Sequence, residues 1–200
     1  TMFKLNQKGA MFGLDARVAL AIMGAISIIA GYYSISRIGT ARTAGLVKEL
    51  SNYEEAFLGY QSDMGTFLLF TLNGASNGVR DLEVLWDQSE VLAGLRKRWS
   101  GPYYKYKSYT RDHSDYGEFS ITYGQADANL STCTSSSSCY AWLTLSDVPL
   151  ETWMEINEAV DEAFGSDAEA SADEEGKVRA DSLGSDPVTL YYRVLERPTN

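Results

Sequence analysis

The spacing of hydrophobic residues changes within the N-terminal part of the chain. From Val18 to Tyr33 no charged residue occurs, so this segment is apolar on every side of a helix. Further along, the spacing of three and four places the apolar residues on one side of a helix: Leu46, Val47, Leu50, Tyr53, Phe57 and Tyr60. No proline lies between Thr1 and Arg98. The pattern therefore predicts one helix from Leu14 to Tyr60, about 68 Å long, apolar in its first half and amphipathic in its second.

The rest of the chain predicts shorter elements. Gln61 to Gly65 is typical of a helix end with Gly65 just beyond it, and a second helix is expected over Val79–Arg98 with a loop at Asn73-Gly74 before it. Runs rich in Tyr, Thr and Val predict four strands: Tyr103–Tyr109, Glu118–Thr122, Tyr140–Leu145 and Val188–Leu195. A short helix is expected over Met154–Phe164. The expected fold is α+β, with a small antiparallel sheet packed on the amphipathic half of the long helix.

Length and charge narrow the class of protein. A chain of 200 residues holds one domain, expected over 61–200, in addition to the N-terminal segment. The net charge of −10 argues against nucleic acid as the default partner. The 13 tyrosines favour strands and half-exposed surfaces.

Three interpretations compete for the N-terminal segment. Lys4 and Lys8 precede a small-residue junction at Gly9-Ala10, and the apolar stretch follows that junction. An ordinary secretory signal has its cleavage site after the apolar stretch instead. The uncharged stretch from Val18 to Ser36 is close to the ~20 residues of a membrane-crossing helix, so a signal anchor is the second interpretation. The third interpretation is a helix that binds a partner. It follows from Asp15, because a carboxylate within an apolar helix is costly and is usually kept for a partner.

This segment resembles the type IV pilins and the pseudopilins of type II secretion. The matching residues are Lys8-Gly9-Ala10, Met11-Phe12-Gly13-Leu14-Asp15 and the apolar run to Tyr33. The resemblance implies that a prepilin peptidase removes a leader, residues 1–10, between Ala10 and Met11 and methylates the new N-terminus. Residues 11–60 would then form a helix with a membrane-spanning half, and Asp15, the fifth mature residue, would pair with the terminal amine of a neighbouring subunit.

Three features depart from the family pattern. Gly usually precedes the cut, and a cut after Gly9 would make Asp15 the sixth mature residue instead of the fifth. Glu usually stands where this chain has Asp15. Arg17 adds a charge to a zone that is normally apolar. It can pair with Asp15 of a neighbour or extend toward lipid head groups, and we favour the second interpretation. Downstream, the turn Trp99-Ser100-Gly101-Pro102-Tyr103 is similar to one that precedes the first strand of many pseudopilins.

The resemblance implies a structural role without catalysis. The expected function is that of a subunit of a pilus-like or pseudopilus filament, with copies of itself, a prepilin peptidase and an inner-membrane assembly platform as partners. The expected location is the bacterial inner membrane before assembly, followed by a periplasmic or extracellular filament. The alternative is a membrane-anchored surface binding module that never polymerises.

Two cysteines bracket a polar loop. Cys133 and Cys139 enclose Thr134 and four serines. In a chain with an export signal this arrangement favours a disulfide, with two unpaired thiols as the alternative. A zinc site is disfavoured because the chain has a single histidine and no second pair of cysteines.

Three polar clusters have a chemical and a simpler interpretation. His113, Ser114 and Asp115 contain the groups of a hydrolytic site, but neighbours in a polar loop rarely meet at hydrogen-bond distance, so a surface turn is expected. Basic residues alternate with aromatic ones between Arg96 and Arg111. That pattern suits single-stranded nucleic acid, yet we favour a strand with alternating faces. Residues 155–175 contain nine carboxylates, which could bind calcium but are equally typical of the solvated loop that we favour.

Overall fold

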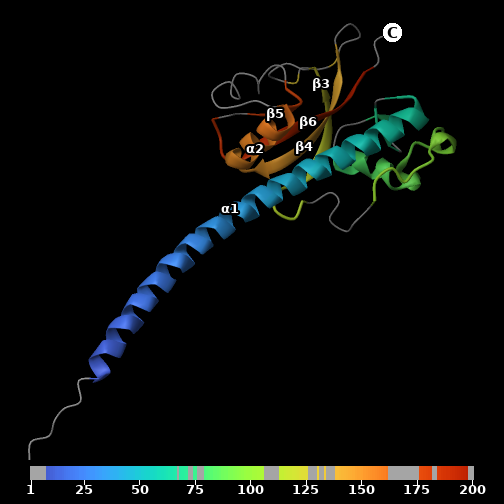
Figure 1. Ribbon diagram of the computed structural model, residues 1–200. Helices are drawn as coiled ribbons and strands as arrows, with labels where there is room; N and C mark the ends of the chain where they lie inside the picture. The colour runs from blue at the N-terminus through green and yellow to red at the C-terminus, as the bar shows by residue number, and fades with distance from the viewer. Residues whose placement is uncertain are drawn as a thin grey trace, which may run out of the picture. The chain divides into compact units, whose positions relative to one another are not determined.

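The computed structural model describes two compact units, Thr1–Arg42 and Thr43–Asn200. The described residues are 8–66, 68–71, 74–75, 79–105, 113–125, 130, 133, 138–161, 176–181 and 184–197, with side chains in α1 described for 18–28 and from 39 onward. Helix α1, Lys8–Met64, begins in the first unit and ends in the second (Figure 1). The predicted helix is therefore present and extends beyond both predicted ends.

The predicted role of Gly65 as the residue just beyond the helix is confirmed, although α1 ends at Met64. Gly65 follows the last helical residue with φ +69°, and its N–H donates to the carbonyl of Gln61 at 2.8 Å. A side chain at this φ is strained, so glycine suits the position.

The predicted inner-membrane location is wrong. Among the described residues, no helix combines the length and apolarity needed to cross a membrane.

The second unit contains a four-stranded antiparallel sheet in the order β3-β4-β6-β5 (Figure 1). The strands are β3 Phe119–Gly124, β4 Tyr140–Val148, β5 Val178–Ala180 and β6 Val188–Glu196. Three of them confirm predicted strands with longer C-terminal ends. The three-residue β5 was not predicted because so short a run carries no periodic signal. A second small sheet pairs β1 Phe70–Thr71 with β2 Gly74–Ala75. Gly74, which the sequence placed in a loop, therefore belongs to a strand, and Asn73 lies outside the described residues.

The core lies between the second half of α1, helix α2 and the four-stranded sheet. Helix α2, Leu150–Asp161, begins four residues earlier than predicted, and the predicted end at 164 lies outside the described residues. The predicted stripe of α1 is at most 1 % exposed at Leu46, Leu50, Tyr53, Phe57 and Tyr60. The ring of Tyr53 lies 5.0 Å from that of Phe119 on β3. The α+β fold with a small antiparallel sheet is therefore confirmed.

The segment 79–98 is not the single helix that the sequence predicted. It forms three 3-10 helices: η1 Val79–Leu85, η2 Gln88–Glu90 and η3 Arg96–Arg98. The Asp87 carboxylate accepts a hydrogen bond from the N–H of Ser89 at 2.8 Å and so caps the N-terminus of η2, which makes η2 a separate helix. The Arg96 guanidinium donates to the carbonyls of Val91 and Ser89, which a continuous helix would bond internally.

The strand predicted over 103–109 is absent from its described part. Residues 103–105 have no strand geometry, and 106–109 lie outside the described residues. The N–H groups of Tyr103 and Tyr104 both donate to the carbonyl of Leu85, at 2.8 and 3.2 Å. This segment is therefore attached to η1 rather than to the sheet.

Replacing Phe57 by Ala tests the core. Phe57 is fully buried, so we expect a loss of about 3–5 kcal/mol in the free energy of unfolding, from lost burial and the cavity left behind. Leu58→Ala is the matched control, because Leu58 is the next residue of α1 and is 50 % exposed. Denaturant unfolding followed by tryptophan fluorescence measures both, and equal losses would contradict the assigned core.

Candidate functional site

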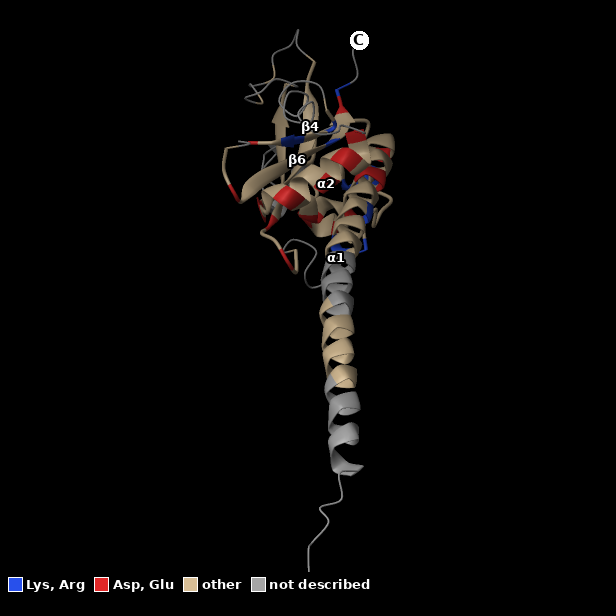
Figure 2. Cartoon of the chain, turned by 60° about the vertical axis from the view of Figure 1, so that its left-hand side comes forward, with Lys and Arg blue, Asp and Glu red and all other residues tan. Residues whose placement is uncertain are grey.

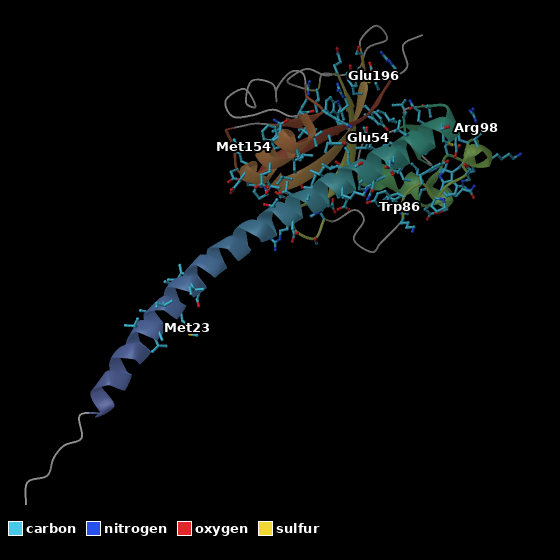
Figure 3. The ribbon with its side chains drawn as sticks, in the orientation of Figure 1. Met23, Glu54, Trp86, Arg98, Met154 and Glu196 are labelled. Atoms are coloured by element: carbon cyan, nitrogen blue, oxygen red, sulfur yellow. A yellow bond between two sulfur atoms is a disulfide. The ribbon has the colours of Figure 1, made fainter. Side chains whose placement is uncertain are left out.

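The first unit exposes large apolar side chains. Between Val18 and Ile28, helix α1 carries six of them with exposed fractions from 52 % to 76 %: Val18, Leu20, Ile22, Met23, Ile26 and Ile28. Figure 3 shows the side chains around Met23 projecting from several sides of the helix. At about 100° per residue these positions are spread around the helix axis. This surface, which we call the apolar collar, therefore differs from an amphipathic helix with one apolar side.

The collar contains no charge. Figure 2 shows neither Lys, Arg, Asp nor Glu on the described part of α1 from 18 to 28, whereas Asp and Glu side chains are visible on α2. Exposed apolar surface of this extent usually marks an interaction site.

The predicted processing and assembly residues lie on the helix just before the collar. Ala10, Met11 and Asp15 all belong to α1, whose first residue is Lys8. Their side chains lie outside the described ones, so the roles assigned to them stay predictions.

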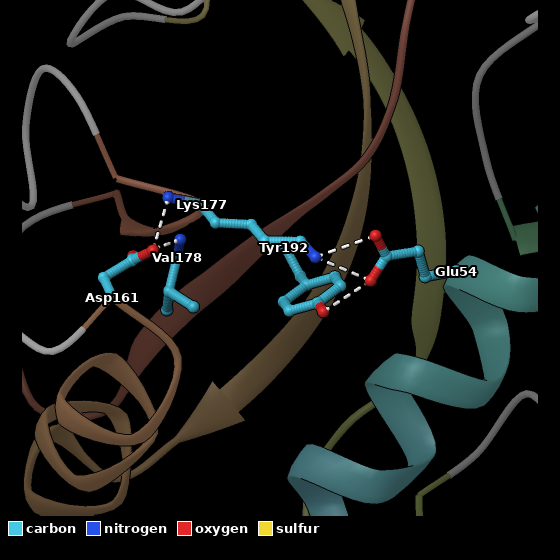
Figure 4. A network of polar contacts seen from close by, with 5 residues as sticks. All are labelled: Glu54, Asp161, Lys177, Val178 and Tyr192. Atoms are coloured by element: carbon cyan, nitrogen blue, oxygen red, sulfur yellow. Dashed lines mark hydrogen bonds and ion pairs between the residues drawn. The ribbon is translucent and has the colours of Figure 1, made fainter.

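A polar network attaches α1 to the sheet in the second unit (Figure 4). The Lys177 ammonium donates to both oxygens of the Glu54 carboxylate, at 2.8 and 2.6 Å. The Tyr192 hydroxyl on β6 donates to the same carboxylate at 2.8 Å. Side chains 123 residues apart in the sequence thus meet at one carboxylate, and no sequence pattern indicated this contact.

The network is half-buried and electrostatically paired. Lys177 and Glu54 have side chains 30 % and 26 % exposed. Burial by itself lowers the pKa of Lys177, but its hydrogen bonds with Glu54 and Tyr192 outweigh that effect and the pKa is raised above 10.5. Burial also raises the pKa of Tyr192. At neutral pH Lys177 is therefore an ammonium and Tyr192 a neutral phenol.

Only three of the nine carboxylates between 155 and 175 belong to the described residues. Asp161 accepts the backbone N–H groups of Lys177 and Val178, at 2.9 and 2.8 Å. Glu155 accepts a hydrogen bond from Thr43 of α1, and Glu158 is exposed. Glu162 and the carboxylates from 167 to 175 lie outside the described residues. In the part of the chain that the structure describes, no group of three potential ligands could hold a metal ion, and calcium binding stays a prediction.

The single histidine lies in a turn, as predicted, but its side chain is 11 % exposed. His113 N–H donates to the Gly117 carbonyl, and its ring stacks on Tyr116 at 4.6 Å. The Nδ1 atom accepts the backbone N–H of Asp115 at 3.1 Å, whereas Nε2 lies 3.6 Å from the Glu49 carboxylate. Asp115 therefore contributes its backbone rather than its carboxylate, and the hydrolytic arrangement is not formed.

Several members of the basic and aromatic segment are bonded within the chain. Trp99 Nε1 donates to the carbonyl of Val84 at 2.8 Å, and the Tyr103 hydroxyl donates to Asp63 at 2.8 Å. The Arg96 guanidinium is bound to backbone carbonyls, and Lys97 and Arg98 are exposed. Lys107 and Arg111 lie outside the described residues.

The predicted disulfide between Cys133 and Cys139 is present. The bond lies next to the start of β4 and closes the serine-rich segment. Most residues of that segment lie outside the described ones. Cys139 itself is buried.

Comparisons with protein-family models, curated proteins and solved structures find no match to this chain.

Lys177→Met tests the network. The change removes the cation from a half-buried carboxylate, so we expect a loss of about 1–2 kcal/mol in the free energy of unfolding, between the values typical of surface and buried pairs. Adding Glu54→Gln should recover part of the loss, because the carboxylate then no longer needs a cation. Denaturant unfolding measures the double-mutant cycle, with the exposed Lys97→Met as control. Strictly additive effects would show that the two groups do not interact.

Alkaline pH should destabilise the second unit. Burial is the largest cause of the raised pKa values of Tyr53 and Tyr104, and the pKa of Lys177 is raised as well. The folded state then holds protons that the unfolded state releases. The two tyrosines contribute fully to the stability of the folded state below pH 10.0, the ordinary pKa of tyrosine. This contribution is lost as the pH rises from 10.0 through the higher pKa values that the tyrosines have in the folded state.

Unfolding free energies measured from about pH 8 to pH 11 should therefore fall above pH 10. Tyr104→Phe removes one of these groups and should give a shallower fall. Equal slopes in the two proteins would contradict a protonated, buried Tyr104.

Proposed function

We propose that this chain is a structural subunit of a helical filament, similar to a pilin or pseudopilin, and that it assembles through the N-terminal half of α1. The observation that carries the proposal is the apolar collar, with side chains up to 76 % exposed. The leader-like residues Lys8-Gly9-Ala10 and the carboxylate of Asp15 support it from the sequence.

Copies of the same helix fit the collar better than a single partner groove. A groove covers one side of a helix, but this helix is apolar on all sides and needs surrounding apolar surface. A bundle of identical helices supplies that surface. Burying one large apolar side chain contributes about 1.5–3 kcal/mol, so six of them in a bundle can exceed the cost of association.

Asp15 would set the axial register of the bundle. A carboxylate buried without a partner is destabilising by several kcal/mol, so only those registers that bring a cation to Asp15 are stable. In the proposed mature subunit that cation is the terminal amine of a neighbour. Registers without this pair are rejected, which gives the filament one geometry rather than many.

The second half of α1 carries the head. Residues 43–64 of α1 belong to the same compact unit as the sheet, and the ion pair between Glu54 and Lys177 ties the helix to it. One continuous helix therefore contributes to the core of the head and provides the assembly surface. The function is mechanical and needs no catalytic group.

Ile26→Lys tests the assembly surface. Ile26 is 60 % exposed, so Lys should leave the head folded but place a charge in the bundle, where an unpaired buried charge is costly. We expect at least a tenfold loss of sedimentable filaments, counted also by electron microscopy. Leu58→Lys is the matched control, because Leu58 is exposed on the half of α1 that belongs to the head. Full assembly of Ile26→Lys would contradict the proposal.

Processing at the predicted junction can be measured separately. When the chain is expressed with a prepilin peptidase, mass spectrometry should find a mature protein that begins at N-methylated Met11. Asp15→Asn should be processed normally but form at least tenfold fewer filaments, because the amide cannot pair with the terminal amine as an ion. An intact leader in the presence of the peptidase would contradict the pilin-like pathway.

A further inference from the structure

The second unit contains a cleft that lies outside the apolar collar. It has a volume of about 570 Å³ and lies between α1 and the segment that follows η3. Asn52 and Glu55 line it from α1, and Tyr103, Tyr104 and Lys105 line it from the other side. Its volume is within the range of roughly 300–1,000 Å³ that small-molecule sites occupy.

Two tyrosine rings form a rigid wall of this cleft. The Tyr103 hydroxyl donates to the Asp63 carboxylate at 2.8 Å and accepts the N–H of Ser100 at 3.1 Å. The Tyr104 ring stacks on Tyr53 with centroids 4.2 Å apart and planes 16° from parallel. Both rings are therefore held in place without a ligand, which lowers the entropic cost of binding one.

The polar side chains of the cleft have unused hydrogen-bonding capacity. Within the described part of the chain, no hydrogen bond or ion pair involves the side chain of Asn52, Glu55 or Lys105. Their capacities differ: the carboxylate only accepts, the ammonium only donates, and the amide does both. Among the described lining residues, the one negative charge and the one positive charge compensate each other.

We infer that the cleft binds a saccharide. A hydroxyl group both donates and accepts, so a neutral polyhydroxylated ligand can satisfy Asn52, Glu55 and Lys105 together without introducing a charge. The C–H groups on the faces of a sugar ring carry a small positive charge and pack on the negative face of an aromatic ring. This inference is independent of filament assembly, because both sides of the cleft lie within the head.

The test uses the full chain and soluble oligosaccharides. An array of immobilised oligosaccharides identifies the strongest binder, and isothermal titration measures its affinity for wild type and variants. We expect Asn52→Ala and Lys105→Met each to weaken binding at least fivefold. The matched controls Glu158→Gln and Lys97→Met alter exposed charges that do not line the cleft and should bind as wild type does.

Three outcomes would overturn the inference. The first is that no oligosaccharide binds at millimolar concentration. The second is that the cleft variants and the controls bind equally well, which would place the sugar elsewhere. The third is that a panel of short peptides binds in a manner sensitive to Asn52→Ala while the sugars do not, which would make the cleft a peptide site. Lys105 is exposed, so the Lys105→Met variant should unfold at the wild-type temperature. A loss of binding in this variant then reflects the cleft and not a loss of folding.

Discussion

The burial of one side of α1 against the sheet is the contact on which the head depends. Tyr53, Phe57 and Tyr60 are fully buried on this side, and burial of such side chains contributes about 1.5–3 kcal/mol each. The contact also positions the surrounding parts, because α2, η1 and the strands all contribute residues to the same core. Residues that lie beside the buried stripe are consequently brought close to segments far away in the sequence.

Three carboxylates of α1 contact segments that this packing brings close to the helix. Glu54 binds Lys177 and Tyr192, so it ties the helix to the sheet. Nearer the end of α1, Asp63 accepts hydrogen bonds from Ser100 and Tyr103. On the preceding turns, the Glu49 carboxylate lies 3.5 Å from the Tyr104 hydroxyl and 3.6 Å from His113. Each carboxylate thus attaches a different segment to the helix, and the polar groups meet at the rim of the core, where partial exposure limits the cost of burying charge.

The two halves of α1 differ in where their apolar side chains lie. In its second half, the apolar residues lie on one side and the chain covers them with its own sheet. In its first half, the collar is apolar on all sides and its described side chains are exposed. If copies of this helix cover one another, as we propose, a single element couples the folding of the head to assembly. The saccharide cleft would then lie on the head, built partly from α1 itself.

The sequence alone determined the elements whose pattern is local and periodic. The stripe from Leu46 to Tyr60, the glycine after α1 and three of the four strands of the main sheet follow from spacing and residue type, because backbone geometry repeats every few residues. The division of 79–98 into 3-10 helices, the meeting of Glu54 with Lys177 and the cleft beside Tyr104 were decided by tertiary structure. They depend on side chains that come together only when distant segments pack, and no local pattern records which segments those are.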